Sequence, residues 1–233
     1  MIDATSEDLC ERIAEKSNGV AICSFSMGKD SIAAYIQMKK YFDRIIPVFY
    51  YIVPGLAFQQ RSLEYYQNEV FKDERIIQMP SPATYRQLAY FMYQHPAAID
   101  HIAESDVYIP HYDEIFAAVK EDLNLDQDTY TGVGVRMNDS LNRRFSIKRY
   151  GAENTKRRQF YPVFDWNNDK LISEIRASGI KLPVDYQIWG RSFDGFHYKF
   201  LKPLKDHFPE DFERVKEMYP FVELELLRYG QAI

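Results

Sequence analysis

The sequence predicts an α/β protein: a mostly parallel β-sheet flanked by helices, followed by a helical C-terminal extension. Three observations support this fold class. Short apolar runs alternate with stretches of helical period through the first two thirds of the chain. The 233 residues are enough to enclose a full hydrophobic core. The hydrophobic content of 46% and the charged content of 27% are those of an ordinary globular protein, which argues against intrinsic disorder.

The expected strands and helices alternate in the order that βαβ units require. The strands are expected at residues 20–25, 45–53, 75–79 and 129–135. The helices are expected at residues 31–42, 59–71, 84–93, 113–123 and 169–177. Pro47 is expected near the start of its strand, where a missing amide donor is tolerated. Residues 95–111 have no clear period, the chain after Arg136 is basic and irregular, and about the last 40 residues predict charged helices.

Several classes of protein are excluded by composition. No window approaches the 18 uninterrupted apolar residues of a membrane span, so no membrane partner is expected. Residues 1–8 are acidic and lack the apolar core of a secretory signal. The two cysteines, Cys10 and Cys23, are too few for a disulfide framework, a four-thiolate zinc site or a cysteine-ligated iron–sulfur cluster. We therefore expect a soluble, cytoplasmic protein.

The sharpest feature is the segment Ser-Phe-Ser-Met-Gly-Lys-Asp-Ser at residues 24–31, between the first strand and the first helix. A turn of small residues there leaves backbone amides at a helix N-terminus, which suits a phosphate group. Lys29 adds a cation, and Ser26 and Ser31 add hydroxyl groups. Asp30 is unfavourable beside a bare phosphate unless it holds Mg2+ or orients neighbouring donors.

The alternative is that Asp30 and Ser31 only cap the helix and Gly28 only permits the turn. Capping alone does not require the whole Ser-x-Gly-Lys-Asp-Ser pattern at this junction. The segment is not a Walker A loop, because Cys23 occupies the position of its first glycine.

Residues 26–31 resemble the Ser-Gly-Gly-Lys-Asp-Ser loop of the PP-loop ATP pyrophosphatase superfamily, with Met27 at the position of the first glycine. Residues 131–144 are similar to the Gly-Ile/Val-Arg-x-x-Asp/Glu-Ser-x-x-Arg segment of phosphoadenosine phosphosulfate (PAPS) reductases. Residues 161–183 resemble the Asp-Trp segment of the same branch, which ends in Leu-Pro. The three motifs span about residues 20–191 in the family's order.

The resemblance implies a Rossmann-like adenine nucleotide α-hydrolase fold, as a single domain over 1–233 with a core of about 18–190 and an extension of about 191–233. It implies an enzyme that acts at the α-phosphate of ATP, releases pyrophosphate and transfers the adenylyl group to an unknown acceptor. A first alternative is PAPS binding or reduction with an external thiol, since no cysteine follows Cys23. A second is a non-catalytic nucleotide-binding component of a nucleic-acid modification system. Relatives without the cysteine are familiar in phage genomes, so a phage origin is consistent with the sequence.

The residues that match the motifs form two overlapping candidate sets. Nucleotide binding is expected from Ser24, Ser26, Met27, Gly28, Lys29, Asp30, Ser31, Gly134, Arg136 and Arg191. Catalysis is expected from Lys29, Asp30, Arg136, Arg143 and Arg144. The expected ligand is ATP or PAPS, with Mg2+ held at Asp30 and without an iron–sulfur cluster.

Charge is concentrated near these residues. Eight basic and two acidic residues lie in 136–158, a net charge of +6, whereas the rest of the chain carries −11. Arginine side chains match phosphate and sulfate oxygens, so Arg136, Arg143 and Arg144 are expected to form an anion clamp. For 156–158 a solvated basic face is an equal alternative. The basic segment 143–158 could also contact nucleic acid, and the sequence leaves this alternative open. It also leaves open whether the chain forms a homo-oligomer.

Overall fold

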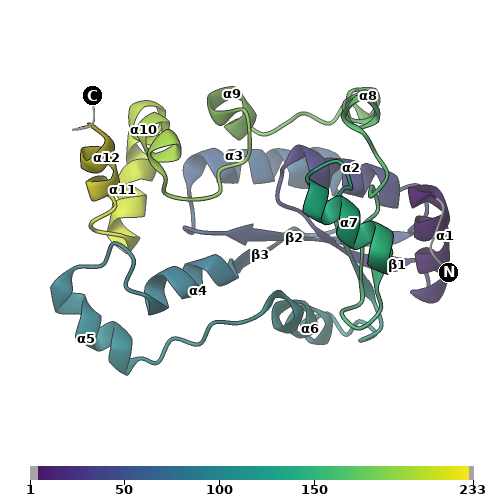
Figure 1. The fold of residues 1–233 in the computed structure, drawn as a ribbon, viewed down its shortest axis with the longest axis horizontal. Helices are drawn as coiled ribbons and strands as arrows, with labels where there is room; N and C mark the ends of the chain where they lie inside the picture. Colours follow the sequence, from purple (N-terminus) through teal and green to yellow (C-terminus); the bar gives the residue numbers. More distant parts are fainter. Residues whose placement is uncertain (1–4, 231–233) are drawn as a thin grey trace. The chain divides into compact units, whose positions relative to one another are not determined.

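The computed structural model describes residues 5–230 and shows an α/β architecture (Figure 1). The strands are β1 Val20–Ser24, β2 Arg44–Tyr51, β3 Ile77–Pro80, β4 Tyr130–Val133, β5 Glu153–Asn154 and β6 Gln159–Phe160. The helices of the first half are α1 Ser6–Lys16, α2 Lys29–Met38, α3 Ala57–Tyr65, the π-helical turn η1 Tyr66–Val70, α4 Pro82–Ala89, α5 Pro96–Glu104 and α6 Tyr112–Asp122. Those of the second half are α7 Leu141–Tyr150, α8 Asn168–Ser178, α9 Asp185–Trp189, α10 Tyr198–His207, α11 Pro209–Met218 and α12 Glu223–Gly230.

The strands form one six-stranded sheet in the order β3-β2-β1-β4-β6-β5. β1 pairs in parallel with both β2 and β4, and β4 pairs in parallel with β6. Only β5 is antiparallel to its neighbour β6. The predicted fold class, a mostly parallel sheet flanked by helices, is therefore confirmed.

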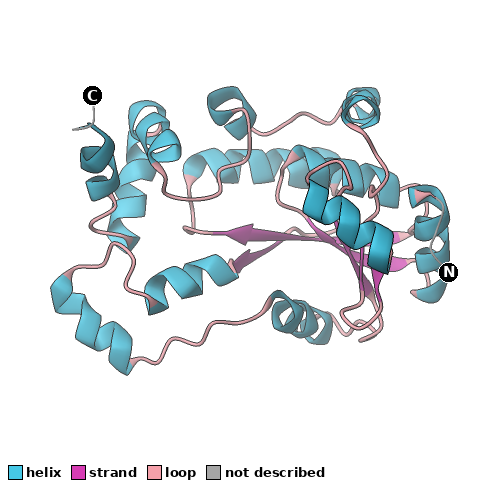
Figure 2. Ribbon diagram, in the orientation of Figure 1, coloured by secondary structure: helices cyan, strands magenta, loops and turns pink. Residues whose placement is uncertain are grey.

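Helices cover both faces of the sheet around β1 and β4, with α2 on one side and α6 on the other (Figures 1 and 2). The three central residues of β1 are fully buried, as expected for a parallel strand that is covered on both faces. Gly132 in β4 makes room for α2. A Cβ at this position would lie 2.5 Å from the sulfur of Met38 and 3.1 Å from Cγ of Pro162.

The chain divides into two compact units. Unit 1 consists of Met1–Phe49, Tyr66–Ile77 and Asp113–Leu182, and unit 2 of Tyr50–Tyr65, Gln78–Tyr112 and Pro183–Ile233. The core of unit 2 is largely aromatic, with Phe58 packed against Trp189 and Phe193 at ring distances of 5.4 and 5.6 Å. The single domain expected for 1–233 stays a prediction.

Some boundaries differ from the sequence-based expectation, and so do three helices, α5, α7 and the short α9. α2 begins at Lys29, two residues earlier than expected. Pro47 lies inside β2, in register with Cys23, rather than near the strand start. α5 and α7 were not expected: α5 buries no residue, and α7 buries only Ile147 and has no apolar period. The hairpin β5–β6 was also missed, because its strands are two residues long.

Within residues 5–230, none of the helices is both long enough and apolar enough for a membrane span. Residues 1–4, part of the acidic segment in which no secretory signal is expected, lie outside the described residues, and so do residues 231–233.

Candidate functional site

The 26–31 segment lies where β1 passes into α2. β1 has β2 on one side and β4 on the other, so the loop after Ser24 stands at the point where the strand order reverses. Ligands of open parallel sheets bind at such points, beyond the carboxyl ends of the strands. The topology therefore places the predicted nucleotide-binding segment at the expected edge of the sheet.

The N-terminus of α2 has no side-chain cap. Its N-cap residue is Gly28, which has no side chain that could accept a hydrogen bond from the first turn. Because the first N–H groups of a helix have no partner within the helix, they and the helix dipole favour an anion there. The alternative that Asp30 and Ser31 serve as the cap does not describe this helix.

Met27 holds the turn before α2 in an unusual conformation. Its φ is +59°, in the left-handed region that glycine adopts readily, and its side chain is only 1% exposed. A non-glycine residue in this region costs about 1–2 kcal/mol. The turn thus has a backbone conformation that suits glycine, while the side chain at this position is buried.

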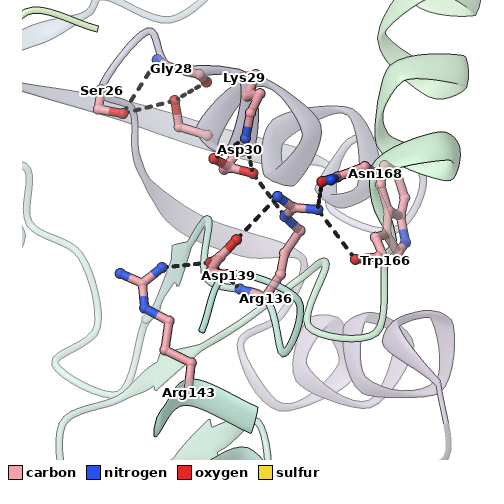
Figure 3. A network of polar contacts seen from close by, with 10 residues as sticks. Ser26, Gly28, Lys29, Asp30, Arg136, Asp139, Arg143, Trp166 and Asn168 are labelled. Carbon is pink, nitrogen blue, oxygen red and sulfur yellow. Dashed lines mark hydrogen bonds and ion pairs between the residues drawn. The ribbon is translucent and has the colours of Figure 1, made fainter. Parts of the chain in front are cut away.

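Three polar contacts fix the loop (Figure 3). The Ser31 hydroxyl donates to the Gly28 carbonyl at 2.8 Å. The Ser26 hydroxyl donates to Oγ of Ser31 at 3.2 Å, and the Gly28 amide donates to Oγ of Ser26 at 3.4 Å. Ser26 is exposed and Ser31 is buried, so Ser26 presents the accessible hydroxyl of the segment.

Asp30 lies between two cations. Nζ of Lys29 is 2.9 Å from Oδ2 of Asp30, and Nε of Arg136 is 2.8 Å from Oδ1. The Arg136 contact is an ion pair whose alignment is not that of a hydrogen bond. Both carboxylate oxygens of Asp30 thus face positive groups of the protein.

Arg136 is 3% exposed, and its guanidinium is surrounded by oxygen atoms (Figure 3). Nη2 is 3.1 Å from Oδ1 of Asp139, and Nη1 donates to Oδ1 of Asn168 at 3.0 Å and to the Trp166 carbonyl at 3.4 Å. The guanidinium is therefore engaged within the protein and links the first turn of α2 to the start of α8.

The network continues outward through Asp139, whose Oδ2 accepts a hydrogen bond of 2.5 Å from Nη1 of Arg143. Lys29, Asp30, Arg136, Asp139 and Arg143 thus alternate in sign and together carry a net charge of +1. The Arg143 side chain is about half exposed. It is therefore the outermost charge of this chain of ion pairs.

Gly134 has a steric role at the end of β4. A Cβ there would lie 2.5 Å from the carbonyl oxygen of Asp30 and 2.8 Å from the amide of Ser31, both backbone atoms. Only glycine allows β4 to come this close to the first turn of α2. The nucleotide binding expected of Gly134 stays a prediction.

The other candidates lie outside this network. Arg144 is exposed on α7 and makes no ion pair within residues 5–230. Arg191 belongs to unit 2, where it pairs with Asp194 and lies 5.7 Å from the centre of the Phe200 ring. Ser24 ends β1 and is half-buried.

The candidate sets from sequence did not include Asp139, Trp166 or Asn168. The signal for Asp139 was present, because it occupies the acidic position of the Gly-x-Arg-x-x-Asp/Glu-Ser pattern. Trp166 contributes only its backbone carbonyl, which no side-chain pattern reveals. Asn168 follows the Asp-Trp pair by two residues and had no signal of its own.

Neither cysteine presents an accessible thiol. Cys10 on α1 and Cys23 in β1 are both fully buried. Burial raises the pKa of the Cys23 thiol to about 12. Cys23 is therefore an inert core residue at neutral pH.

No protein-family model matches the chain, and no curated protein matches it in sequence. Among solved structures, the chain is similar to the U34-tRNA thiolase NcsA from Methanococcus maripaludis with its 4Fe-4S cluster, at a TM-score of 0.42 and 10% sequence identity. The similarity covers 94% of this chain and 79% of the thiolase.

This comparison corrects the cofactor expectation. The sequence led us to expect no iron–sulfur cluster, but the solved neighbour carries one, so that expectation is withdrawn. The Mg2+ expected at Asp30 is withdrawn as well, because both oxygens of this carboxylate face Lys29 and Arg136. Within residues 5–230, no three His, Cys, Asp or Glu side chains are grouped so as to hold a metal ion.

Proposed function

We propose that the 26–31 segment binds the phosphate groups of an adenine nucleotide, and that the chain acts at the α-phosphate of ATP. The observation that carries the proposal is the glycine N-cap of α2, Gly28, which follows the left-handed turn at Met27. The preference for adenine and for ATP rests on the resemblance of residues 26–31 to the PP-loop sequence.

In this proposal the phosphates accept hydrogen bonds from the first amides of α2 and from the exposed Ser26 hydroxyl. Lys29 is 38% exposed, so its ammonium group can turn from Asp30 toward a phosphate without leaving a buried position. On phosphate binding, rotation of the Lys29 side chain would bring its ammonium group from Asp30 to the phosphate.

Asp30 is the one negative charge at the first turn of α2, and Arg136 compensates it. Because the Arg136 guanidinium contacts Asp30, Asp139, Asn168 and the Trp166 carbonyl, we assign it the part of a positioning residue. It holds the Asp30 carboxylate away from the ligand. Arg143 and Arg144, which are exposed, are the cations left to stabilise negative charge during transfer.

The proposed reaction is nucleophilic substitution at the α-phosphorus. A lone pair of the acceptor forms the new bond to phosphorus while the bond to the bridging oxygen of the β-phosphate breaks. Pyrophosphate leaves with that electron pair, and the adenylyl group remains on the acceptor. The acceptor's proton goes to solvent, and no step passes through a thiol of this chain.

Calorimetric titration with ATP and with PAPS tests the binding step. We expect ATP to bind more tightly, and Lys29→Ala to weaken its binding about ten-fold or more through loss of a charge-assisted contact. Lys72→Ala is the matched control, because Lys72 is exposed and makes no ion pair in the described part of the chain. Equal ATP affinity in a folded Lys29→Ala variant would contradict phosphate binding at this segment.

Pyrophosphate release from ATP tests the chemistry. Release in proportion to a nucleophile added as acceptor, such as hydroxylamine, supports adenylyl transfer. Tighter binding of PAPS, with sulfite formed when an external dithiol is added, would replace the proposal by sulfonucleotide reduction. Tight ATP binding without release of pyrophosphate would indicate a non-catalytic nucleotide-binding protein instead of an enzyme.

A further inference from the structure

α7 (Leu141–Tyr150) is an unusual helix because only Ile147 is buried. Leu141 and Phe145 are each 67% exposed, and Tyr150 is 68% exposed. A helix whose stability came from a packed apolar face would bury several residues in ten. Nothing in the core of unit 1 therefore accounts for the large apolar side chains on this helix.

The charge of α7 is of one sign. Arg143, Arg144, Lys148 and Arg149 are four of its ten residues, and the helix has no acidic residue. Arg143 is paired with Asp139. The other three cations make no ion pair with any residue of 5–230, whereas Arg157 and Arg158 on the following hairpin are paired with Asp113 and Asp128. Of the four cations of the basic segment 143–158 that make no ion pair within residues 5–230, three lie on α7 and the fourth is Lys156.

The exposed rings of α7 do not form one apolar face. Leu141 and Phe145 are four residues apart and share a side of the helix, but Tyr150, five residues beyond Phe145, lies on another side. A helix that inserts into a membrane surface needs one broad apolar face. Single aromatic rings between cations are instead typical of surfaces that stack nucleic-acid bases and neutralise the phosphates beside them.

We propose that α7 binds single-stranded nucleic acid. Lys148 and Arg149 contact the phosphates, and Phe145 and Tyr150 stack on bases. The Arg149 guanidinium lies 5.1 Å from the centre of the Tyr150 ring, so a cation and a stacking ring are already adjacent. The proposal stands on α7 alone and does not depend on the nucleotide bound at residues 26–31.

Fluorescence anisotropy with labelled oligo-dT and oligo-U of about 20 nucleotides tests the proposal, since these exceed the usual site size of single-strand binders. The double variant Lys148→Gln/Arg149→Gln is expected to bind about ten-fold more weakly at 0.1 M salt. The slope of log affinity against log salt should fall by about 1.4, because two phosphate contacts are lost at about 0.7 each.

The matched control is Lys72→Gln/Arg75→Gln. It removes the same charge from exposed positions of unit 1 that make no ion pair within 5–230. Equal loss of affinity in both variants would overturn the proposal in favour of nonspecific attraction to net charge.

Phe145→Ala separates stacking from charge. Because Phe145 is exposed, its removal leaves the core intact, and circular dichroism verifies that the variant is folded. We expect roughly ten-fold weaker binding with an unchanged salt slope. Unchanged affinity, or tighter binding of duplex than of single strands, would overturn stacking on α7. Absence of oligonucleotide binding, together with binding to anionic phosphatidylserine vesicles, would assign the helix to a membrane surface instead.

Discussion

Nε of the buried Arg136 lies 2.8 Å from Oδ1 of Asp30, which joins the end of β4 to the first turn of α2. The same guanidinium holds Asp139 and Asn168, so three segments of unit 1 meet on one side chain. Arg136 therefore stabilises the packing of these segments, a role that its position in a sequence motif does not show.

Replacement of Arg136 by Met should therefore destabilise the protein strongly. We expect the free energy of unfolding to fall by about 3–5 kcal/mol, because two carboxylates lose their buried partner. Urea denaturation measures the change. Arg143→Met is the control: Arg143 is half exposed, so its pair with Asp139 contributes less than about 1 kcal/mol. Equal losses in the two variants would contradict the network.

The variant Met27→Gly should be more stable than Met27→Ala, although alanine is the more stabilising of the two residues inside a helix. Both substitutions lose the burial of the Met side chain, and each should cost about 2–4 kcal/mol. Alanine keeps the strain of the positive φ, whereas glycine removes it, so Met27→Gly should be the more stable variant by about 1 kcal/mol. Thermal unfolding of the pair checks the order. A more stable alanine variant would mean that the turn relaxes.

Gly134→Ala should disrupt the site as well as the fold. The added Cβ meets the backbone of Asp30 and Ser31, which cannot rotate away as a side chain can. We expect a loss of about 3 kcal/mol in stability. Gly195→Ala serves as the comparison, because nothing lies within 4 Å of the added carbon and the backbone is not left-handed there. The prediction fails if the two variants unfold at the same urea concentration.

The thiols should be unreactive in the native protein. At pH 8 a pKa of about 12 lowers the thiolate fraction of Cys23 by about a thousand-fold relative to a free thiol. Cys10 is also fully buried. Reaction with a chromogenic disulfide before and after addition of urea measures both. Rapid reaction of a native thiol would show that the core opens around it.

Stability should depend on pH through Glu153. Although burial acts to raise its pKa, hydrogen bonds from Tyr130, Arg12 and Lys16 hold the pKa below the usual glutamate value. The stabilisation is present above the usual pKa, about 4.3, and is lost as the pH falls through the lower folded value. Glu153→Gln should cost about 1 kcal/mol at pH 7, and the difference between the two proteins should shrink as the pH falls through the lowered pKa of Glu153. A difference that is constant with pH would assign the effect to packing.

The sequence predicted those parts of the molecule that depend on local pattern. The strands around β1 and the helix after the 26–31 segment follow from apolar runs and a turn, so the fold class and the edge of the sheet could be inferred. The three motifs indicated Lys29, Asp30 and Arg136, and the structure places these in one network.

Contacts between residues that are far apart in the sequence could not be predicted from local apolar patterns. Phe58 and Phe193 are far apart in sequence and share one aromatic core, which no periodicity reveals. Arg136 was expected to face a ligand, because a motif does not show that Asp139 and Asn168 occupy its guanidinium. α7 was missed since exposed helices have no apolar stripe.

The pairing of β1 also determines when the site forms during synthesis. Ala21 pairs with Ile45, 24 positions later, but also with Tyr130, 109 positions later. The 26–31 segment leaves the ribosome early, whereas Arg136 and Asn168 follow only after more than half of the chain. A ribosome adds about 5–20 residues per second, so for several seconds Asp30 and Lys29 belong to a chain without its central strand partner. Assembly of this site is a late event of folding, governed by a distant contact rather than by the loop itself.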